Sequence, residues 1–322
     1  MVLFIGLPII SSFFQSLHIE PEQILMEVEK CDPFGCKTET KVDIEATTKL
    51  QEEQPLGRFN GLGTYGDRNH LAFDEIKEAW TNSSSIAEFT DILLNLPFYK
   101  ALLFTLTFCF AVTPPVVVLG FIVALSVNTI TKSLKGPTIF GVILPMIVTP
   151  LIGSLVLFWM IDAKGILGSF IQFLFDDPNL SLKSSSQLTW ITLIIYGIWH
   201  NTPFAFVVFY AALQTVPQDP IEAAIIDGAS RYERVRHIVI PHLYPVATFI
   251  ILICLMDNFR VLEPIIGFAA EGVAQSLSWM IYNDLRSENK MLFGSAGATS
   301  MLTIIGVAIL FCLLYTSPSP RD

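Results

Sequence analysis

Three ionisable side chains lie inside an apolar stretch in the second half of the chain. Asp257, Arg260 and Glu263 follow one another at intervals of three, and residues 244–269 carry no other formal charge. On a helix this spacing places the three groups on one face, where they could neutralise one another or contact a polar solute. Because a charge in apolar surroundings is costly, such groups are candidates for a functional site.

A second group of polar and aromatic side chains surrounds Pro203. Residues 196–206 read YGIWHNTPFAF, and Pro203 leaves a backbone carbonyl about one turn upstream without its helical donor. Aromatic faces beside amide and imidazole groups suit a sugar, whose C–H face stacks and whose hydroxyls form hydrogen bonds. His200 is either a ligand or a packing residue. The group comprises Trp199, His200, Asn201 and Phe204.

Membrane-spanning helices are the elements that must position these groups. Of the 322 residues, 52% are hydrophobic and 15% are charged, whereas soluble domains average about 25% charged residues. A helix needs about 20 apolar residues to cross a bilayer. Five apolar stretches approach or exceed this length and predict spans: 101–127, 137–161, 188–213, 244–269 and 294–311.

Both ends of the chain depart from this pattern. Residues 2–17 are apolar but short, and they predict a sixth span clipped at its N-terminus. A signal peptide is the alternative, although basic residues and a small-residue cleavage site are missing. Residues 312–322, CLLYTSPSPRD, resemble a translated sequencing adapter that cuts off the last span; a short Pro/Ser tail is the alternative. We therefore expect an all-α membrane protein of about six transmembrane helices, with the first and last truncated.

Charge is concentrated in one polar segment. Residues 19–97 carry 16 acidic and 7 basic side chains, which accounts for most of the net charge of −10 and gives no indication of nucleic-acid binding. Lysine and arginine are denser in loops 128–136 and 215–243, with five in 38 residues, than in 162–187 and 270–293, with four in 50. The positive-inside rule therefore places loop 215–243 in the cytoplasm and the acidic segment outside.

The five cysteines fall into two groups. Cys109, Cys254 and Cys312 lie in apolar runs and are expected to pack as small hydrophobic side chains. Cys31 and Cys36 flank the sequence DPFG in the acidic segment. If that segment is extracytoplasmic, the two could form a disulfide that closes a turn; two free thiols are the alternative.

The loop 215–243 carries signals for the start and the end of helices. Asp219 and Glu222 have the spacing of a capping box, and Gly228 would end the helix about two turns later. A second capping box, SRYE, starts at Ser230. These residues therefore predict one short helix, a glycine break, and a second helix that leads into the next span. Taken alone, they require only a structural role.

The spacing within this loop is more specific than its helix signals. The loop reads EAA from Glu222, then a glycine at Gly228, then I-x-I-P from Ile238 to Pro241. This closely resembles the EAA loop of permease subunits in ATP-binding-cassette importers, EAA-x3-G-x9-I-x-L-P, with isoleucine in place of leucine. The chain is also similar to the carbohydrate-uptake branch, and within it to the maltose-permease F type, in three further stretches: 59–65, 144–162 and 256–268.

The resemblance implies a type I importer fold in which the EAA helix docks in a cleft of a separate ATPase subunit. The chain contains no G-x-x-x-x-G-K-[ST] sequence, so ATP and magnesium would bind to that partner, and this chain would hold no cofactor, metal or catalytic residue. The other implied partners are a second, G-type permease subunit, an extracytoplasmic solute-binding protein, a sugar substrate and membrane lipid, with no nucleic acid. The implied location is the bacterial inner membrane, which the chain would cross several times. The ATPase-coupling candidates are Glu222, Ala223, Ala224, Asp227, Gly228, Ile238 and Pro241.

The resemblance also widens the set of residues expected along the solute pathway, because the family's substrate contacts lie in two matching spans. The implied organisation is a clipped helix at 1–18, an extracytoplasmic segment at 19–97, a transmembrane domain at 98–311 that includes the coupling loop, and a non-native tail. The pathway candidates are Trp199, His200, Asn201, Phe204, Leu255, Asp257, Asn258 and Arg260.

Two other functions stay open. An importer of the same class could carry a polyol or glycerol phosphate, although a phosphate favours a more basic pathway than the single Arg260 supplies. An intramembrane enzyme could use Asp257 or His200, although no paired motif such as H-E-x-x-H or G-x-S-x-G is present. The sequence therefore favours the import of a sugar or oligosaccharide by alternating access.

Overall fold

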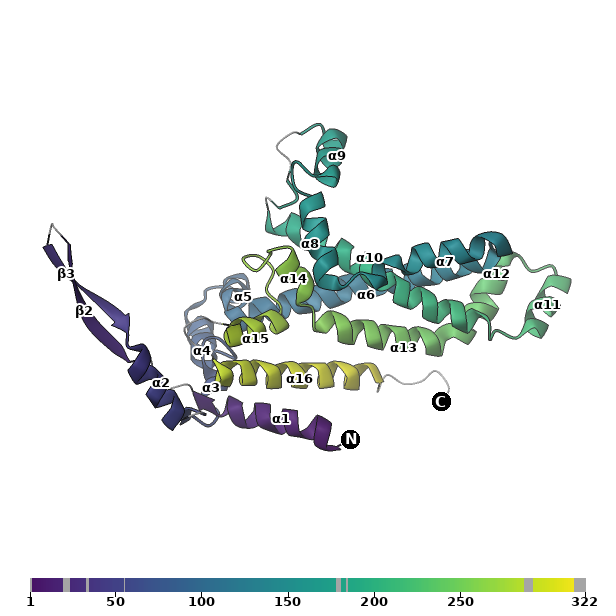
Figure 1. The fold of residues 1–322 in the computed structure, drawn as a ribbon. Coiled ribbons are helices and arrows are strands. Elements are labelled where there is room, and N and C mark those ends of the chain that lie inside the picture. Colours follow the sequence, from purple (N-terminus) through teal and green to yellow (C-terminus); the bar gives the residue numbers. More distant parts are fainter. Residues whose placement is uncertain are drawn as a thin grey trace. The chain divides into compact units, whose positions relative to one another are not determined.

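The computed structural model describes residues 2–19, 24–32, 35–54, 56–177, 181–183, 185–286 and 292–315. Most of them are helical (Figure 1). They form two compact units, one of Ala101–Trp279 and one of Met1–Lys100 with Met280–Asp322. Among the described residues, four helices are long and apolar enough to cross a membrane, or five if one bent pair counts as a single span.

Long helices make up most of the unit Ala101–Trp279. In this unit, α7 and α13 pack against α10. A short π-helical turn, η1, joins α12 to α13, so that the three form one continuous helix. The bounds are α6 (Pro97–Thr129), α7 (Lys132–Ile147), α8 (Pro150–Met160), α9 (Ile166–Phe175), α10 (Ser186–Leu213), α11 (Gln218–Ile226), α12 (Arg231–Arg234), η1 (Val235–Val239), α13 (Ile240–Phe259) and α14 (Glu263–Gly267).

The predicted span 137–161 is two helices rather than one. α7 and α8 meet at an angle of 94°. Thr149, which precedes Pro150, has φ −61° and ψ 144°, because a proline ring disfavours the helical conformation in the residue before it. The predicted apolar stretch is therefore present as a bent pair, which counts as one span or as none, and α8 runs across the direction of α7.

The predicted span 244–269 ends earlier than expected. α13 stops at Phe259, and the short helix α14 begins separately at Glu263. Arg260 lies just beyond the last turn of α13. The expectation that Asp257, Arg260 and Glu263 share one helix face is therefore wrong, since the helix does not continue through all three.

The contact between α6 and α10 lies at the centre of this unit. A methyl group added to Gly120 would lie 2.5 Å from the Ala205 Cβ atom, and one added to Gly197 would lie 2.8 Å from the Phe108 ring. Glycine thus allows the two helices to approach more closely than a larger residue would permit. The surrounding core includes Phe104, Leu193, Tyr196, Phe206, Phe209 and Ile250.

The second unit pairs the first and the last helix of the described chain. α1 (Val2–Ser16) packs along α16 (Phe293–Tyr315). A methyl group on Gly297 would lie 2.9 Å from the Ser12 carbonyl oxygen, so glycine permits this approach as well. α1 has 15 residues, fewer than the roughly 20 that a full span needs.

Short strands and helices of the acidic segment complete this unit. β1 pairs with β4 and β2 with β3, both in antiparallel fashion. The strands are β1 (His18–Ile19), β2 (Leu25–Asp32), β3 (Gly35–Val42) and β4 (Arg58–Phe59). The helices are α2 (Ile44–Glu53), α3 (Gly63–Gly66), α4 (Phe73–Asn82) and α5 (Ile86–Asn95), followed late in the chain by α15 (Leu277–Arg286).

Buried polar contacts attach the acidic segment to the helices of its unit. The Nε2 atom of His70 lies 3.1 Å from the Ser295 carbonyl oxygen and 3.2 Å from the Thr299 hydroxyl, both on α16. The Tyr65 hydroxyl lies 2.7 Å from the Ser16 hydroxyl on α1. The part of the segment that follows β4 is therefore fixed to both long helices.

Two expectations fall on parts of the chain that the structure does not fully describe. The backbones of Cys31 and Cys36 are direct partners in the β2–β3 hairpin, but their side chains lie outside the described atoms, so the disulfide stays a prediction. Residues 316–322 of the expected adapter-derived tail also lie outside the described residues.

The close approach of α6 and α10 predicts a specific loss of stability. We expect Gly120→Val to lower the free energy of unfolding by about 1–3 kcal/mol, because its side chain would overlap Ala205. Gly141→Val on α7 is the matched control, since no atom lies within 4 Å of its Cβ position. Thermal unfolding of both variants in detergent measures the difference; equal melting temperatures would contradict the importance of this contact.

Candidate functional site

Two asparagines and a threonine join three helices inside the unit Ala101–Trp279. Asn201 on α10 donates from Nδ2 to Oδ1 of Asn258 on α13, at 3.0 Å. Asn258 donates from its own Nδ2 to the Thr113 hydroxyl oxygen on α6, at 3.2 Å. Because Asn258 is buried, its amide would be costly to leave without partners. The structure thus brings two of the pathway candidates together.

His200 lies against an aromatic ring of its own helix. Its ring stacks on Tyr196, with centroids 5.8 Å apart and an angle of 11° between the planes. The Tyr196 hydroxyl donates to the Pro150 carbonyl oxygen at 2.8 Å, at the start of α8. Nδ1 of His200 is buried and makes no hydrogen bond of good geometry. Since buried polar atoms are usually paired, the ligand interpretation of His200 is kept as a prediction.

Trp199 points away from the asparagine pair. Residues two apart on a helix project about 200° from each other, so Trp199 and Asn201 occupy opposite sides of α10. The Trp199 side chain is 47% exposed. It lines an apolar groove of about 530 Å³ between α6, α7 and α10, together with Leu119, Val142, Pro145 and Thr202.

The other pathway candidates lie in different surroundings. Asp257 and Arg260 form an ion pair of 2.6 Å at an exposed end of α13. Leu255 is buried, and Phe204 packs half-buried against the core. The eight candidates therefore do not form one cluster. His200 and Asp257 make separate contacts, and within the described ranges no three His, Cys, Asp or Glu side chains gather to hold a metal.

The loop 215–243 is closed at its base by polar contacts. The Thr215 hydroxyl lies 3.4 Å from Nε2 of His242, which joins the two ends of the loop. Beside it, Gln214 donates from Nε2 to Oδ1 of Asn128 at 3.3 Å. The loop is therefore held on the ends of the long helices. The buried apolar residues at its base are Val216, Val239 and Leu243.

Within this loop, α11 presents an exposed face. Ile221 packs against the core, which turns the opposite side of the helix outward. Pro217 occupies the N-cap position of α11, and no side chain caps its first turn. The prediction that Asp219 caps this helix is therefore wrong. The exposed residues of α11 that bear on docking are Glu222, Ala223, Ile225 and Ile226.

Gly228 ends α11 as predicted. Its φ of +76° lies in the left-handed region, which glycine adopts without strain. The Gly228 N–H donates to the Ile225 carbonyl oxygen at 3.1 Å, and the Ala229 N–H donates to the Ala224 carbonyl oxygen at 2.8 Å. This pair of bonds is a Schellman motif, which satisfies carbonyls that the helix end leaves free.

The second predicted capping box, at Ser230, is confirmed. The Ser230 N–H donates to the Glu233 carboxylate at 2.7 Å, and the Glu233 N–H donates to the Ser230 hydroxyl at 3.3 Å. Hydrogen bonds from Ser230 hold the pKa of the Glu233 carboxyl below its ordinary value. After α12, the N–H of Ile240 bonds to the Val235 carbonyl oxygen, five residues back. Pi-helical turns of this kind are frequent at functional sites.

The remaining coupling candidates lie around these motifs. Asp227 is exposed at the C-terminal end of α11, and Ala224 is half-buried. Ile238 is half-buried within η1, and Pro241 is exposed in the first turn of α13. The structure thus places all seven candidates on one loop with a defined geometry. What they contact in a partner stays a prediction.

Two residues of the pathway region escaped the sequence analysis. Thr113 completes the hydrogen-bonded chain from Asn201, and Tyr196 stacks on His200. The Thr113 contact joins helices distant in sequence, and its one signal was that Thr113 directly precedes the pair Pro114 and Pro115, at which carbonyls of α6 lose their donors. Tyr196 lies four residues before His200 on the same helix, so the spacing could have predicted their stacking.

Comparison with known proteins relates the chain to a family and to individual relatives. Residues 86–317 match the family of binding-protein-dependent transport system inner membrane components. The trehalose/maltose transport system permease protein MalF of Thermococcus litoralis is 31% identical over 147 residues, 42% of this chain and 48% of that protein. The sn-glycerol-3-phosphate transport system permease protein UgpA of Pectobacterium atrosepticum is 27% identical over 225 residues, 68% of this chain and 75% of that protein. The match spans about half the length of the former relative.

A solved structure is similar in fold. It is a crystal structure of a bacterial ABC transporter involved in the import of the acidic polysaccharide alginate. The TM-score is 0.59 with 16% sequence identity, covering 85% of this chain and 96% of that chain. At this identity the likeness concerns the fold alone. It agrees with the expected type I importer fold.

The hydrogen-bonded chain through Asn258 predicts that this residue stabilises the helix assembly. We expect Asn258→Leu to lower the free energy of unfolding by about 1–3 kcal/mol, because Asn201 and Thr113 both lose a partner. Thr113→Val removes only one of the two bonds and is expected to cost less. Thermal unfolding of the two variants and of their combination checks this, and strictly additive losses would show that the bonds do not act together.

Proposed function

Because the chain belongs to the family of binding-protein-dependent transport system inner membrane components, we propose that it is the permease subunit of an ATP-driven importer for a sugar or oligosaccharide. The observation that carries this proposal is the geometry of loop 215–243. α11 is a short helix held on a closed base, ended by Gly228 and exposed on one face. Such a helix is suited to receive force from a separate protein.

The exposed face of α11 has the chemistry of a docking surface. Glu222 offers a carboxylate to basic groups of an ATPase partner, and Ala223 permits close approach of a second backbone. Ile225 and Ile226 add apolar area, with Ile226 86% exposed. Isolated charges and apolar groups are common on surfaces, but here they share one helix with fixed ends. Closure of an ATPase pair would therefore move α10 and α13 through this loop.

Polar groups between the spans support a sugar as the cargo. The amides of Asn201 and Asn258 carry donors and acceptors, and the imidazole of His200 lies against the Tyr196 ring. These are the groups that hydroxyls and a sugar C–H face require. We propose that the cargo passes this region during alternating access, in contact with some of these side chains.

Glycerol phosphate is the second candidate cargo. The relative UgpA, whose name states glycerol-3-phosphate transport, matches over a larger share of both chains than MalF does. A phosphate would favour a free arginine or lysine in the pathway, whereas Arg260 is already paired with Asp257. The side chains therefore favour an uncharged sugar.

The proposed importer contains further subunits. Two ATPase subunits would bind ATP and magnesium, a G-type permease subunit would complete the pathway, and an extracytoplasmic solute-binding protein would deliver the cargo. In this arrangement the loop 215–243 faces the cytoplasm and residues 19–97 lie outside. The chain itself would make and break no covalent bond.

Two substitutions test the coupling role of the loop. We expect Glu222→Lys to abolish uptake while the subunit stays in the membrane, because it reverses the charge on the exposed face of α11. We expect Gly228→Asp to do the same by adding a second carboxylate, since the Cβ position of Gly228 projects into open space. Uptake of labelled sugar into vesicles that contain the whole complex is the measurement.

Matched variants separate coupling from folding. Gly228→Asn has the shape of aspartate and tolerates the left-handed backbone without the charge, so it should retain more transport than Gly228→Asp. Glu78→Lys reverses an exposed charge on α4 instead and should leave uptake unchanged. Normal uptake by Glu222→Lys would contradict the coupling role.

The cargo is identified by transport with the complete set of subunits. Vesicles that contain the complex and the solute-binding protein should accumulate a labelled sugar only when ATP is supplied on the ATPase side. Accumulation of glycerol phosphate in place of every sugar tested would favour the second candidate. Accumulation without ATP would contradict the proposed mechanism.

A further inference from the structure

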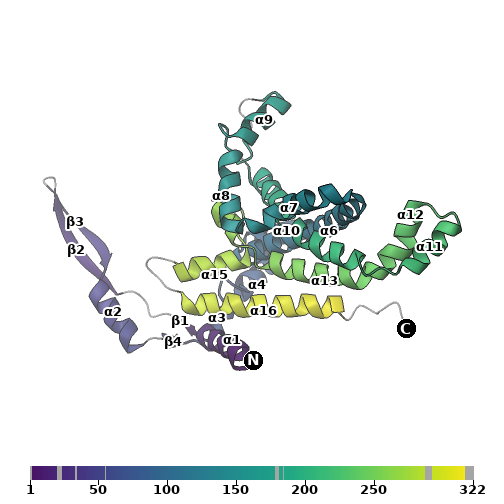
Figure 2. The same cartoon turned by 45° about the vertical axis from the view of Figure 1, so that its right-hand side comes forward.

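The bend between α7 and α8 creates an arm that leaves the helix bundle. α7 packs against α10, whereas α8 turns by 94° from α7. α8 has 11 residues and therefore reaches about 16 Å sideways. It packs against α14 and carries α9 at its far end, as both views show (Figures 1 and 2). Since α9 precedes α10 and α11 follows it, the arm and the loop 215–243 lie at opposite ends of α10.

α9 exposes an apolar stripe along its length. Ile166–Phe175 contains no charged residue. Ile166, Phe170, Phe173 and Leu174 follow the i, i+4, i+7, i+8 spacing of one helix face. Their side chains are 79%, 59%, 83% and 64% exposed. In a water-soluble protein this face would be turned inward, so its exposure requires a partner or an apolar solvent.

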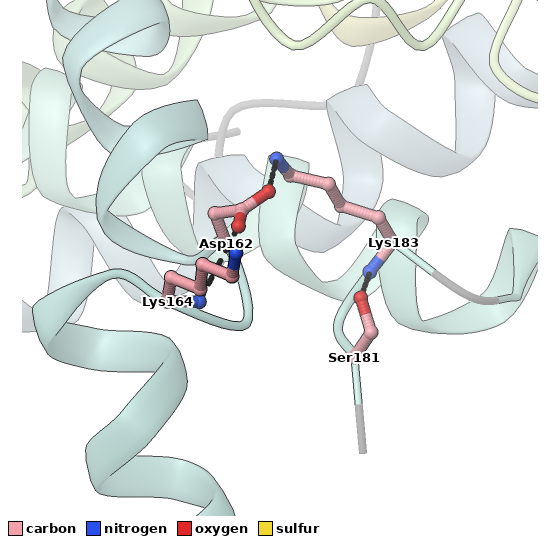
Figure 3. Close-up of polar contacts among 4 residues, drawn as sticks. All are labelled: Asp162, Lys164, Ser181 and Lys183. Atoms are coloured by element: carbon pink, nitrogen blue, oxygen red, sulfur yellow. Dashed lines mark hydrogen bonds and ion pairs between the residues drawn. The ribbon is translucent and has the colours of Figure 1, made fainter. Parts of the chain in front are cut away.

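Polar groups close the base of the arm. Lys183 lies 3.1 Å from the Asp162 carboxylate, and its ammonium group lies 3.3 Å from the centre of the Phe158 ring. The Lys164 N–H donates to the other Asp162 oxygen at 3.3 Å (Figure 3). The hydrogen bond from Lys183 holds the pKa of the Asp162 carboxyl below its ordinary value. These contacts join the two ends of segment 162–183, which contains α9.

Close backbone packing fixes α9 relative to α8. A methyl group on Gly168 would lie 2.0 Å from the Asp162 carbonyl oxygen, and one on Gly165 would lie 2.4 Å from the Met160 carbonyl oxygen. Neither position has room for a side chain. The buried side of α9 thus rests on the end of α8, and the stripe is held in one orientation, facing away from it.

We propose that α9 is an interfacial membrane anchor, whose stripe of Ile166, Phe170, Phe173 and Leu174 lies at the boundary between lipid headgroups and acyl chains. An apolar helix face of this kind sits about 5–10 Å deep at that boundary. The anchor lies on the membrane side opposite to the loop 215–243. It steadies the N-terminal end of α10 against the bilayer.

Lipid fits this surface for two reasons. α8, which leads into α9, also exposes apolar side chains, and the chain belongs to a family of inner membrane components, so lipid can cover both helices. The polar side chains of α9, Ser169 and Gln172, lie on the side of the helix away from Phe170 and Leu174, as expected for a helix lying flat at an interface. The exposed apolar residues of α8 are Leu151, Ile152, Leu155, Val156 and Trp159.

Site-specific fluorescence in lipid tests this proposal. The full chain, with its five cysteines replaced by serine, is reconstituted into phospholipid nanodiscs as Phe173→Cys and labelled with an environment-sensitive dye. We expect blue-shifted emission that lipids brominated near the headgroup quench more strongly than lipids brominated at the chain end. Phe170→Cys, on the same stripe, repeats the measurement in case the first variant folds poorly.

Ser169→Cys provides the matched control, because Ser169 is exposed on α9 but lies beside the stripe. Its label should respond less to brominated lipid and more to aqueous iodide. Equal iodide quenching at residues 169, 170 and 173 would overturn the proposal. A stripe label that ignores brominated lipid and becomes shielded only when a solute-binding protein or a second permease subunit is added would also overturn it, in favour of a protein interface.

Discussion

The close contact of α6 and α10 is the constraint on which the unit Ala101–Trp279 depends. Gly120 against Ala205 and Gly197 against Phe108 leave no space for larger side chains. Between lipid-exposed helices there is little hydrophobic driving force, so tight packing of small residues supplies much of the attraction. With α10 fixed in this way, α7 and α13 have a surface to pack on.

The polar groups of this unit are arranged so that few are left without partners. Asn201, Asn258 and Thr113 satisfy one another across three helices. Specific residues also mark where helices begin and end. Pro150 starts α8 after the bend, and Gly228 ends α11, where two backbone hydrogen bonds satisfy its last carbonyls. His200 is an exception, with a buried ring nitrogen that lacks a good partner. Nε of Arg234 is a second buried atom of this unit without a hydrogen bond.

Some local sequence signals led to correct predictions, although the predicted cap at Asp219 is not formed. The stop at Gly228 and the capping box at Ser230 depend on residues within one turn of each other, and both are present. Hydropathy located the apolar stretches but not the bend at Thr149, because a proline inside an apolar run is compatible with a kinked or a broken helix. The end of α13 at Phe259 had a local signal in Pro264, which cannot donate to the Arg260 carbonyl. The hydrogen bonds of Asn258 could not be predicted, since they join helices distant in sequence. For the same reason the eight pathway candidates, grouped by chain position, separate onto different helix faces.

The π-helical turn Val235–Val239 sets the rotational phase between the loop and α13. Its widened ring accommodates one residue more than a regular α-helical turn. Everything before it, including α12 and the attached α11, is therefore rotated by about 100° relative to where an unbroken α-helix would put it. The direction of the exposed face of α11 thus depends on a single additional residue. A one-residue deletion here would leave every side chain of α11 intact and still turn them by about 100° relative to α13.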